Sequence, residues 1–213
     1  MRLLLASNNA AKLRELQTLF APLGFDLVTQ GSLGIAEADE PHATFIENAL
    51  AKARHAALWS QGAAIADDSG LCVDALGGAP GVVSAHFADF ELPPVEREAQ
   101  RRLQDAANNA LLLQRMQGVP DRRARFVCTL VAVRAADDPE PLIATGRWQG
   151  TLLQEAQGSA GFGYDPLLFI PALAHSVAEL DAATKNAHSH RARAAAQLRP
   201  LLREVWGLPV GDG

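Results

Sequence analysis

Short apolar runs alternate with amphipathic stretches along this chain, which is the pattern of a β-sheet flanked by helices. In the first third, residues 2–6 and residues 25–28 predict two strands. Between them, apolar side chains at helical spacing predict a helix from residue 10 to about residue 22. A second helix is predicted over residues 44–60, because Thr44 and Glu47 match the capping-box pattern at its start.

The pattern continues with a third strand over residues 64–68, which is predicted to turn and return as a strand over residues 71–76. The later predicted elements are a helix over 93–116, a hairpin of strands over 124–134 and 141–153, a strand over 167–170, and helices within 176–205. No repeat or linker interrupts the pattern, so we expect a single domain, residues 1–213, of mixed α/β class.

The most polar feature inside this apolar framework is Asp67-Asp68-Ser69-Gly70, at the predicted end of the third strand. Carboxylates at a strand end commonly supply metal ligands or a general base. Asp, Ser and Gly are also the usual turn formers, so a plain turn stays open on this segment alone. Because successive side chains of a strand point to opposite faces, only one of the two acids is expected to face a metal directly.

Charge and composition narrow the classes of partner. The formal net charge of −5 and a pI near 5.7 argue against a general nucleic-acid-binding surface. No apolar run approaches the roughly 18 residues of a membrane span, and residues 1–6 are too short for a signal sequence. Cys72 and Cys128 match no metal or redox spacing, so we expect a reducing, cytoplasmic setting.

The first predicted strand runs directly into a helix start, Ser7-Asn8-Asn9-Ala10-Ala11-Lys12. Ser and Asn are favoured at helix N-caps, so this junction offers backbone N–H groups and the positive end of a helix dipole. Lys12 adds a full positive charge, and phosphate is the natural ligand of such a junction. The alternative is an ordinary capped helix with an exposed lysine.

Three further segments carry chemistry that complements a phosphate site. The loop before the second helix contains the acids Asp39 and Glu40. Residues 161–165 combine two glycines with two aromatic side chains, and the last quarter contains Lys185 and the pair His190-Arg191. Carboxylate side chains can bind Mg²⁺, cationic side chains can bind phosphate, and an aromatic loop can stack on a ring system. Together these segments predict a nucleotide-binding site.

Six segments between residues 7 and 191 occur in one characteristic order: Ser7-Asn8-Asn9-Ala10-Ala11-Lys12, Thr44-Phe45-Ile46-Glu47-Asn48-Ala49, Ala66-Asp67-Asp68-Ser69-Gly70-Leu71, Leu76-Gly77-Gly78-Ala79-Pro80-Gly81, Gly161-Phe162-Gly163-Tyr164-Asp165-Pro166 and Ser189-His190-Arg191. This set resembles the inosine/xanthosine triphosphate pyrophosphatase family. The resemblance implies an elongated mixed sheet flanked by helices, two lobes around a central nucleotide-binding cleft, a homodimer and Mg²⁺ dependence. It also implies hydrolysis of dITP, ITP and XTP to the monophosphate and pyrophosphate, which removes deaminated purines from the nucleotide pool.

The same resemblance assigns roles to individual residues. Asp68 resembles the general base and a metal-linked carboxylate, with Asp67 in support. Asp39 and Glu40 match an acidic pair that supplies a second metal ligand, and the sequence does not separate them. The implied substrate contacts are Ser7, Asn8, Asn9, Ala10, Ala11, Lys12 and Lys52 for the triphosphate, Ser69 near the nucleotide, and Phe162, Gly163, Tyr164, Asp165, Lys185, His190 and Arg191 for the base.

Two alternatives remain open. One is a pyrophosphatase of the same architecture that acts on other modified nucleotides or on pyrimidine nucleotides. The other is a nucleotide-binding module without turnover, which the presence of both Asp68 and Lys12 disfavours because a pure binder needs no base. His86 departs from the family pattern, which has an arginine there, so its role is left unassigned.

Overall fold

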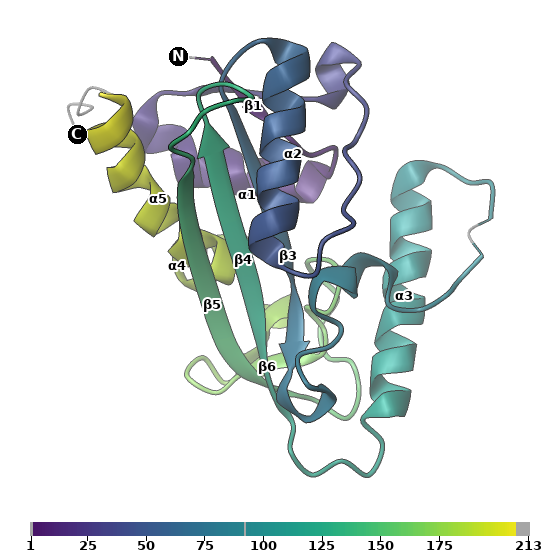
Figure 1. The fold of residues 1–213 in the computed structure, drawn as a ribbon. Coiled ribbons are helices and arrows are strands. Elements are labelled where there is room, and N and C mark those ends of the chain that lie inside the picture. Colours follow the sequence, from purple (N-terminus) through teal and green to yellow (C-terminus); the bar gives the residue numbers. More distant parts are fainter. Residues whose placement is uncertain (1, 92, 208–213) are drawn as a thin grey trace. The chain divides into compact units, whose positions relative to one another are not determined.

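The computed structural model of the protein describes residues 2–91 and 93–207 (Figure 1). Within these residues the strands form one seven-stranded sheet in the order β2-β1-β3-β4-β5-β6-β7. The strands are β1 (Arg2–Leu5), β2 (Asp26–Thr29), β3 (Ala64–Val73), β4 (Arg123–Val133), β5 (Leu142–Leu152), β6 (Leu168–Ile170) and β7 (His175–Ser176). β1 pairs in parallel with β2 and β3, while β6 pairs antiparallel with β5 and β7, so the predicted mixed sheet is confirmed.

The α-helices of the described residues are α1 (Ala10–Phe20), α2 (Phe45–Ser60), α3 (Arg97–Arg115), α4 (Ala182–His188) and α5 (His190–Trp206). The predicted N-cap of α2 is confirmed, because the Thr44 hydroxyl accepts a hydrogen bond from the backbone N–H of Glu47 at 3.3 Å. The Glu47 carboxylate accepts from the Thr44 hydroxyl at 2.6 Å, so only the Thr44 half of the predicted capping box is seen in the described structure. None of the helices in this part of the chain combines the length and the apolar character needed to cross a bilayer. The sequence pattern predicts a short tail after the last helical region, and its residues 208–213 lie outside the described residues.

The chain divides into two compact units, and β3, β4 and β5 contribute residues to both. The first unit comprises residues 1–68, 128–147 and 186–213, and the second comprises residues 69–127 and 148–185.

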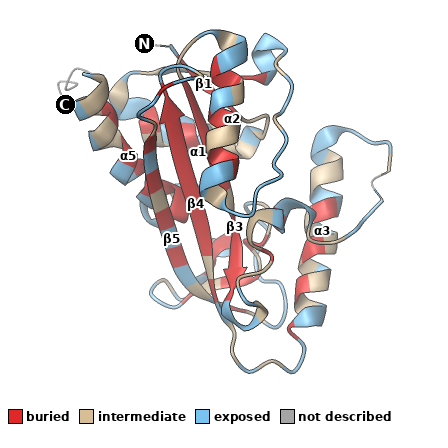
Figure 2. Cartoon of the chain, in the orientation of Figure 1, coloured by how far each residue is buried: buried red, intermediate tan, exposed pale blue. Residues whose placement is uncertain are grey.

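The sheet of the first unit carries a helix layer on each face, and strand alternation assigns the side chains to them. Leu3, Leu5 and Ile65 pack in one buried cluster with residues of α1 and α5. Leu4 and Ala64 pack in another cluster with the small residues of α2. Within the first unit, the alternation of β3 therefore places Ile65 and Asp67 on the side of α1 and α5, and Ala64, Ala66 and Asp68 on the side of α2. Figure 2 shows how completely β3 and β4 are buried.

The second unit has its own core, in which Leu112 and Met116 at the end of α3 pack against Leu71 and Phe126. Its hairpin is confirmed: the carbonyl of Arg122, next to the start of β4, accepts from the backbone N–H of Leu152 at the end of β5, at 2.8 Å. Strands whose start and end pair in this way run antiparallel.

The predicted turn after residue 68 is wrong. β3 continues without interruption from Ala64 to Val73, followed by a 3-10 helix over Asp74–Leu76 in place of a return strand. The turn-forming residues are accommodated inside the strand, because both acids are paired with cations and Gly70 lies where a Cβ would collide with Gly81 O and the Ser84 hydroxyl. The acidic pair is therefore a mid-strand feature.

Two helix boundaries also differ from the sequence prediction. α3 begins at Arg97, four residues after the predicted start at Pro93. The predicted helical last quarter is divided into a 3-10 helix over Val177–Glu179, α4 and α5. The division before α5 falls at Ser189, whose hydroxyl accepts from the N–H of Ala192 at 3.1 Å and so caps the last helix.

Candidate active site

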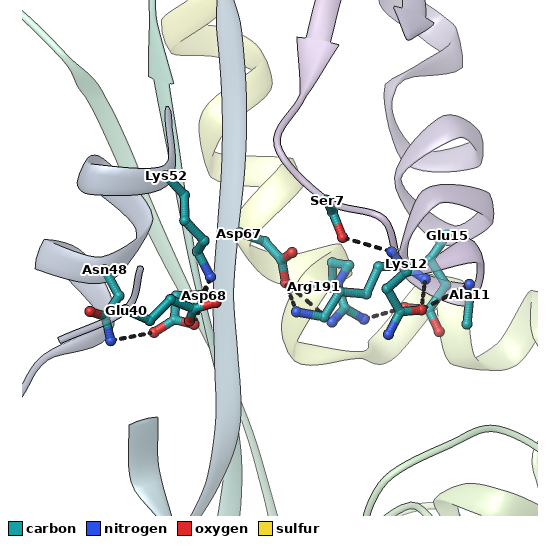
Figure 3. A network of polar contacts seen from close by, with 11 residues as sticks. Ser7, Ala11, Lys12, Glu15, Glu40, Asn48, Lys52, Asp67, Asp68 and Arg191 are labelled. Atoms are coloured by element: carbon teal, nitrogen blue, oxygen red, sulfur yellow. Dashed lines mark hydrogen bonds and ion pairs between the residues drawn. The ribbon is translucent and has the colours of Figure 1, made fainter. Parts of the chain in front are cut away.

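Asp67 and Asp68 lie on opposite sides of β3, each within its own set of charged partners (Figure 3). Asp68 points toward α2, and Asp67 points toward α1 and α5, as the alternation of the strand requires. Both carboxylates are almost completely buried, with exposed fractions of 2% for Asp67 and 4% for Asp68. Buried carboxylates persist in a fold only when hydrogen bonds or opposite charges compensate their lost hydration.

Asp68 is compensated by two residues of one face of α2. The Lys52 ammonium lies 3.0 Å from Asp68 Oδ1, and the Asn48 amide nitrogen lies 3.4 Å from Asp68 Oδ2. Lys52 also contacts Glu40 Oε2 at 3.0 Å, so one ammonium joins the acidic loop to the strand. Asn48 further holds that loop by accepting from His42 N at 3.0 Å and donating to His42 O at 3.2 Å.

The charges of this group do not balance, because two carboxylates share one ammonium. Burial raises the pKa of Asp68 to about 6, and the attraction of Lys52 offsets that effect only in part. Burial alone would lower the pKa of Lys52, but the charges of Asp68, Asp67 and Glu40 outweigh it and the pKa is raised. The lysine therefore stays charged while the carboxylate retains a tendency to bind a proton or another cation.

The described ion pairs place Asp67 in a group of two cations and two carboxylates. Its Oδ2 is 3.1 Å from the Lys12 ammonium and 3.4 Å from the Arg191 guanidinium. Arg191 also forms an ion pair with Glu15 of α1, and its side chain is almost wholly buried. The attraction of Glu15 and Asp67 raises the pKa of Arg191 above its usual value despite the opposing effect of burial. Two cations and two carboxylates thus join α1, β3 and α5.

The N-terminus of α1 is closed by its own side chains. Asn9 Oδ1 accepts from the N–H groups of Ala11 and Lys12 at 3.0 and 3.1 Å, and the Ser7 hydroxyl accepts from Asn9 N at 3.1 Å. The junction is therefore a capped helix that carries a lysine. Three of the N–H groups predicted to bind phosphate already donate to side chains of residues 7–12. A phosphate would have to replace Ser7 or Asn9 as their acceptor.

In the second unit, the loop 161–165 forms a compact group with Lys185. The Lys185 ammonium lies 2.8 Å from Asp165 Oδ2 and 4.7 Å from the centroid of the Phe162 ring. Asp165 Oδ2 also accepts from Phe162 N at 3.0 Å. Gly161 has φ +81° and lies where a Cβ would strike this carboxylate, so the glycine is required. Three of the residues predicted for base binding are thus in mutual contact.

The donor set around Asp68 fits a divalent cation. Two carboxylates, on Asp68 and Glu40, already converge on a single positive group, and carboxylate oxygens are the ligands that Mg²⁺ prefers. Within residues 2–91 and 93–207, no three His, Cys, Asp or Glu side chains are grouped closely enough to hold a metal by themselves. Further oxygen ligands would have to come from water and substrate, as is usual for Mg²⁺.

Comparison with known proteins identifies the family. The model of the Ham1 family matches residues 3–201. The chain is 69% identical over 206 residues to a dITP/XTP pyrophosphatase of Methylibium petroleiphilum, covering 97% of this chain and 99% of that one. A solved HAM1 protein of Coxiella burnetii matches with a TM-score of 0.84 and 37% identity, covering 96% of this chain and 99% of that chain. The chain belongs to the Ham1 family.

A third match is a solved nucleoside-triphosphatase / dITP/XTP pyrophosphatase of Mycobacterium abscessus, with a TM-score of 0.69 and 38% identity over 94% of this chain and all of that one. These likenesses extend over nearly the whole length of this Ham1 protein. They therefore concern both units.

The structure sorts the predicted site residues of this Ham1 protein into three groups. Asp68, Lys52 and Glu40 form one, and Lys12, Asp67 and Arg191 form the second, both in the first unit. The loop 161–165 and Lys185 form the third, in the second unit. The further predicted residues lie beside these groups: Ser7, Asn8, Asn9, Ala10 and Ala11 at the start of α1, Ser69 on β3 and His190 at the start of α5.

The two acids of the loop before α2 differ in their contacts. Glu40 reaches Lys52, whereas Asp39 is exposed and makes no hydrogen bond or ion pair with Asp68 or Lys52 in the described structure. Of the pair that the sequence left undivided, Glu40 is the acid beside Asp68.

Glu15 and Asn48 belong to these groups, although the sequence pattern did not indicate them as functional candidates. Helix geometry offered a signal for both, because Glu15 follows Lys12 by three residues and Asn48 precedes Lys52 by four. Residues at these spacings share a helix face, so this spacing could have indicated that each lies beside a predicted site residue.

Proposed function

We propose that this Ham1 protein hydrolyses the deaminated purine nucleotides dITP, ITP and XTP to the monophosphate and pyrophosphate. The observation that carries the proposal is the near full-length identity of 69% to a protein named dITP/XTP pyrophosphatase. Each unit supplies groups that this hydrolysis needs: the first has a buried carboxylate and cations for phosphate, and the second has an aromatic loop with a cation beside it.

Asp68 is the general base in this proposal. A carboxylate whose pKa is about 6 is ionised at neutral pH and is more basic than an ordinary aspartate, which favours proton removal from an attacking water. Asn48 and Lys52 hold its two oxygens and thereby fix the direction in which a lone pair points. Asp67 supports the arrangement from the other side of β3 by pairing with Lys12 and Arg191.

Asp68 and Glu40 are the proposed ligands of Mg²⁺, which would neutralise charge on the phosphoryl oxygens when bound. The choice of Glu40 over Asp39 rests on the contact of Glu40 with Lys52. Lys52 keeps the two carboxylates close together, and its charge also favours binding of the triphosphate. Lys12 is the second proposed phosphate contact, at the positive end of α1.

The loop 161–165 and Lys185 are proposed to receive the base. Phe162 offers an aromatic ring for stacking, and Lys185 offers a donor beside it. A donor aimed at the purine 6-oxygen would reject adenine, because the 6-amino group of adenine would leave two donors facing each other. His190 and Arg191 stay part of the proposed base-reading segment, with Arg191 buried between Asp67 and Glu15.

A homodimer and a cytoplasmic location complete the proposal. Both follow from the family resemblance and from the substrate, since deaminated purine nucleotides arise in the intracellular nucleotide pool. Cys72 and Cys128 are buried and form no disulfide within the described residues, which is compatible with a reducing compartment. Sedimentation of the purified protein would measure the oligomeric state.

The test is pyrophosphate release from dITP, XTP, dGTP and dTTP, each with and without Mg²⁺. We expect release from dITP and XTP that requires the metal, and little from the other two. Preference for dTTP would replace the purine assignment with a pyrimidine one. No release from any of the four, with dITP binding retained, would make the protein a binding module.

A further inference from the structure

α3 carries two pairs of polar side chains that hydrogen-bond to the backbone of two different segments of the second unit. Within each pair the residues are four apart, so they share one face of the helix. Gln104 and Asn108 form one pair and contact residues 84–88, while Asp105 and Asn109 form the other and contact Gly163. The two pairs are one residue apart in sequence and therefore point in adjacent directions.

The pair Gln104 and Asn108 has the features of a structural anchor. Both side chains are buried, and they donate to Ala88 O at 2.9 Å and to Ser84 O at 3.2 Å. Asn108 also accepts from Ala88 N at 2.8 Å. Buried amides with these partners hold a chain segment to the helix and would leave several polar groups unsatisfied if removed.

The pair Asp105 and Asn109 binds both backbone polar groups, the N–H and the C=O, of Gly163. Asp105 Oδ2 accepts from Gly163 N at 2.8 Å, and Asn109 Nδ2 donates to Gly163 O at 3.0 Å. Gly163 has φ +63°, a backbone conformation that side-chain-bearing residues rarely adopt, so the loop backbone is fixed at a point where it would otherwise be most free. Phe162 and Tyr164, on either side of Gly163, are oriented by the same two bonds.

These two side chains are poor choices for packing alone. Burial raises the pKa of Asp105 above its usual range even though the N–H of Gly163 acts to lower it. Asn109 Oδ1 is buried without a hydrogen-bond partner in the described part of the chain, a state that costs free energy. An alanine at either position would avoid these costs, so the gain must come from the loop that they hold.

We propose that Asp105 and Asn109 are positioning residues that hold the loop 161–165 in the conformation that receives the nucleotide base. This inference rests on the proposed function, because it assumes that the loop contacts the base. Asp105 and Asn109 act through the backbone of Gly163, and Phe162 and Lys185 make the contact with the base. The hydrogen bond from the Gly163 N–H to the Asp105 carboxylate is charge-assisted, so Asp105 should hold Gly163 more strongly than Asn109 does.

The test compares Asp105→Ala, Asn109→Ala and the conservative Asp105→Asn with wild type. The loop is proposed to touch the base in substrate and transition state alike, so its loosening should raise KM for dITP and leave kcat within twofold. We expect about tenfold for Asp105→Ala and about threefold for Asn109→Ala, in line with charged and neutral hydrogen bonds. Asp105→Asn keeps an acceptor oxygen and should stay within about threefold of wild type.

Two measurements separate positioning from a general loss of structure. Tripolyphosphate has no base, so its inhibition constant should be unchanged in Asp105→Ala if the loop acts on the base. Hydrogen exchange of residues 161–165 in the substrate-free protein should be faster in Asp105→Ala, because the Gly163 N–H loses its acceptor. Arg102→Ala, at an exposed position of the same helix, is the matched control, and Asn108→Ala should instead lower the melting temperature.

The outcomes of these experiments distinguish a failure of the positioning role from a failure of the proposed function on which it rests. Faster exchange with unchanged KM for dITP would make the pair a purely structural tether and overturn the inference. An equal rise in KM for dITP and in the inhibition constant of tripolyphosphate would also overturn it, since the effect would then not concern the base. Absence of turnover in the wild type would refute the proposed function, and dITP binding by calorimetry would then take the place of KM.

Discussion

The two sides of β3 place the same side chain, an aspartate, in opposite electrostatic situations. On the side of α1 and α5, the described ion pairs join Asp67 to two cations and a second carboxylate, and the formal charges of these four residues balance. On the side of α2, Asp68 and Glu40 share one ammonium, which leaves an excess of negative charge. The balanced group joins structural elements, whereas the unbalanced group has capacity for a further cation.

The difference teaches how neighbouring residues of one motif acquire separate roles. Burial is nearly equal for the two acids, so burial alone does not distinguish them. What differs is the number of cations that the surrounding helices supply.

Asp68→Asn tests the proposed general base on the α2 side of β3. Because the amide cannot take a proton from water, kcat for dITP should fall by about 10³-fold or more, while nucleotide binding stays measurable. Pyrophosphate release and calorimetric binding measure the two quantities. Retention of more than about a tenth of the activity would remove Asp68 as the base.

Asp67→Asn tests the stabilising role of the ion pairs on the side of β3 that faces α1 and α5. The change leaves Lys12 and Arg191 short of one counter-charge in a buried setting, so the free energy of unfolding should fall by about 3 kcal/mol. Urea denaturation measures it, with Asp68→Asn as the matched control. A smaller loss of stability than in Asp68→Asn would reverse the roles assigned to the two sides.

Glu40→Gln tests the unbalanced charge. Removal of one carboxylate should raise the Mg²⁺ concentration for half-maximal activity by roughly 10- to 100-fold, which calorimetric Mg²⁺ titration of the substrate-free protein should reproduce. Asp39→Asn, one residue earlier and without contact to Lys52, is the matched control and should change it little. Equal effects of the two substitutions would indicate general surface charge in place of a ligand.

The pH dependence of metal-free protein sharpens the comparison further. The pKa of Asp68 is raised to about 6 in the folded protein, so its contribution to stability is fully present below the unfolded value near 4 and is lost as pH rises through 6. The free energy of unfolding of wild type relative to Asp68→Asn should therefore decrease by about 2 kcal/mol between pH 4 and pH 7.5 in EDTA. A difference that is constant with pH would show that Lys52 fully compensates the carboxylate.

Much of the fold was accessible from the sequence because local patterns specify local structure. Apolar periodicity located α1, α2, α3, β4 and β5 to within a few residues, and Thr44 identified the start of α2. It did not divide the last quarter into α4 and α5, and it ended β3 at residue 68. The prediction of a turn after Asp68 was wrong because it too used only local patterns, and Asp, Ser and Gly favour turns locally. In the fold, cations distant in sequence pair with the acids, and Ser84 packs against Gly70, so the strand continues.

By itself, the sequence determined the residue types of the candidate groups: two adjacent acids on opposite faces of a strand, a lysine at a helix N-terminus and an aromatic loop. Only the tertiary structure decided which cation meets which acid, and why Glu40 and Asp39 differ. The physical reason is that strand alternation is a local property of the backbone. The charge around each carboxylate is instead a sum over Lys12, Lys52 and Arg191, which folding brings together from separate helices.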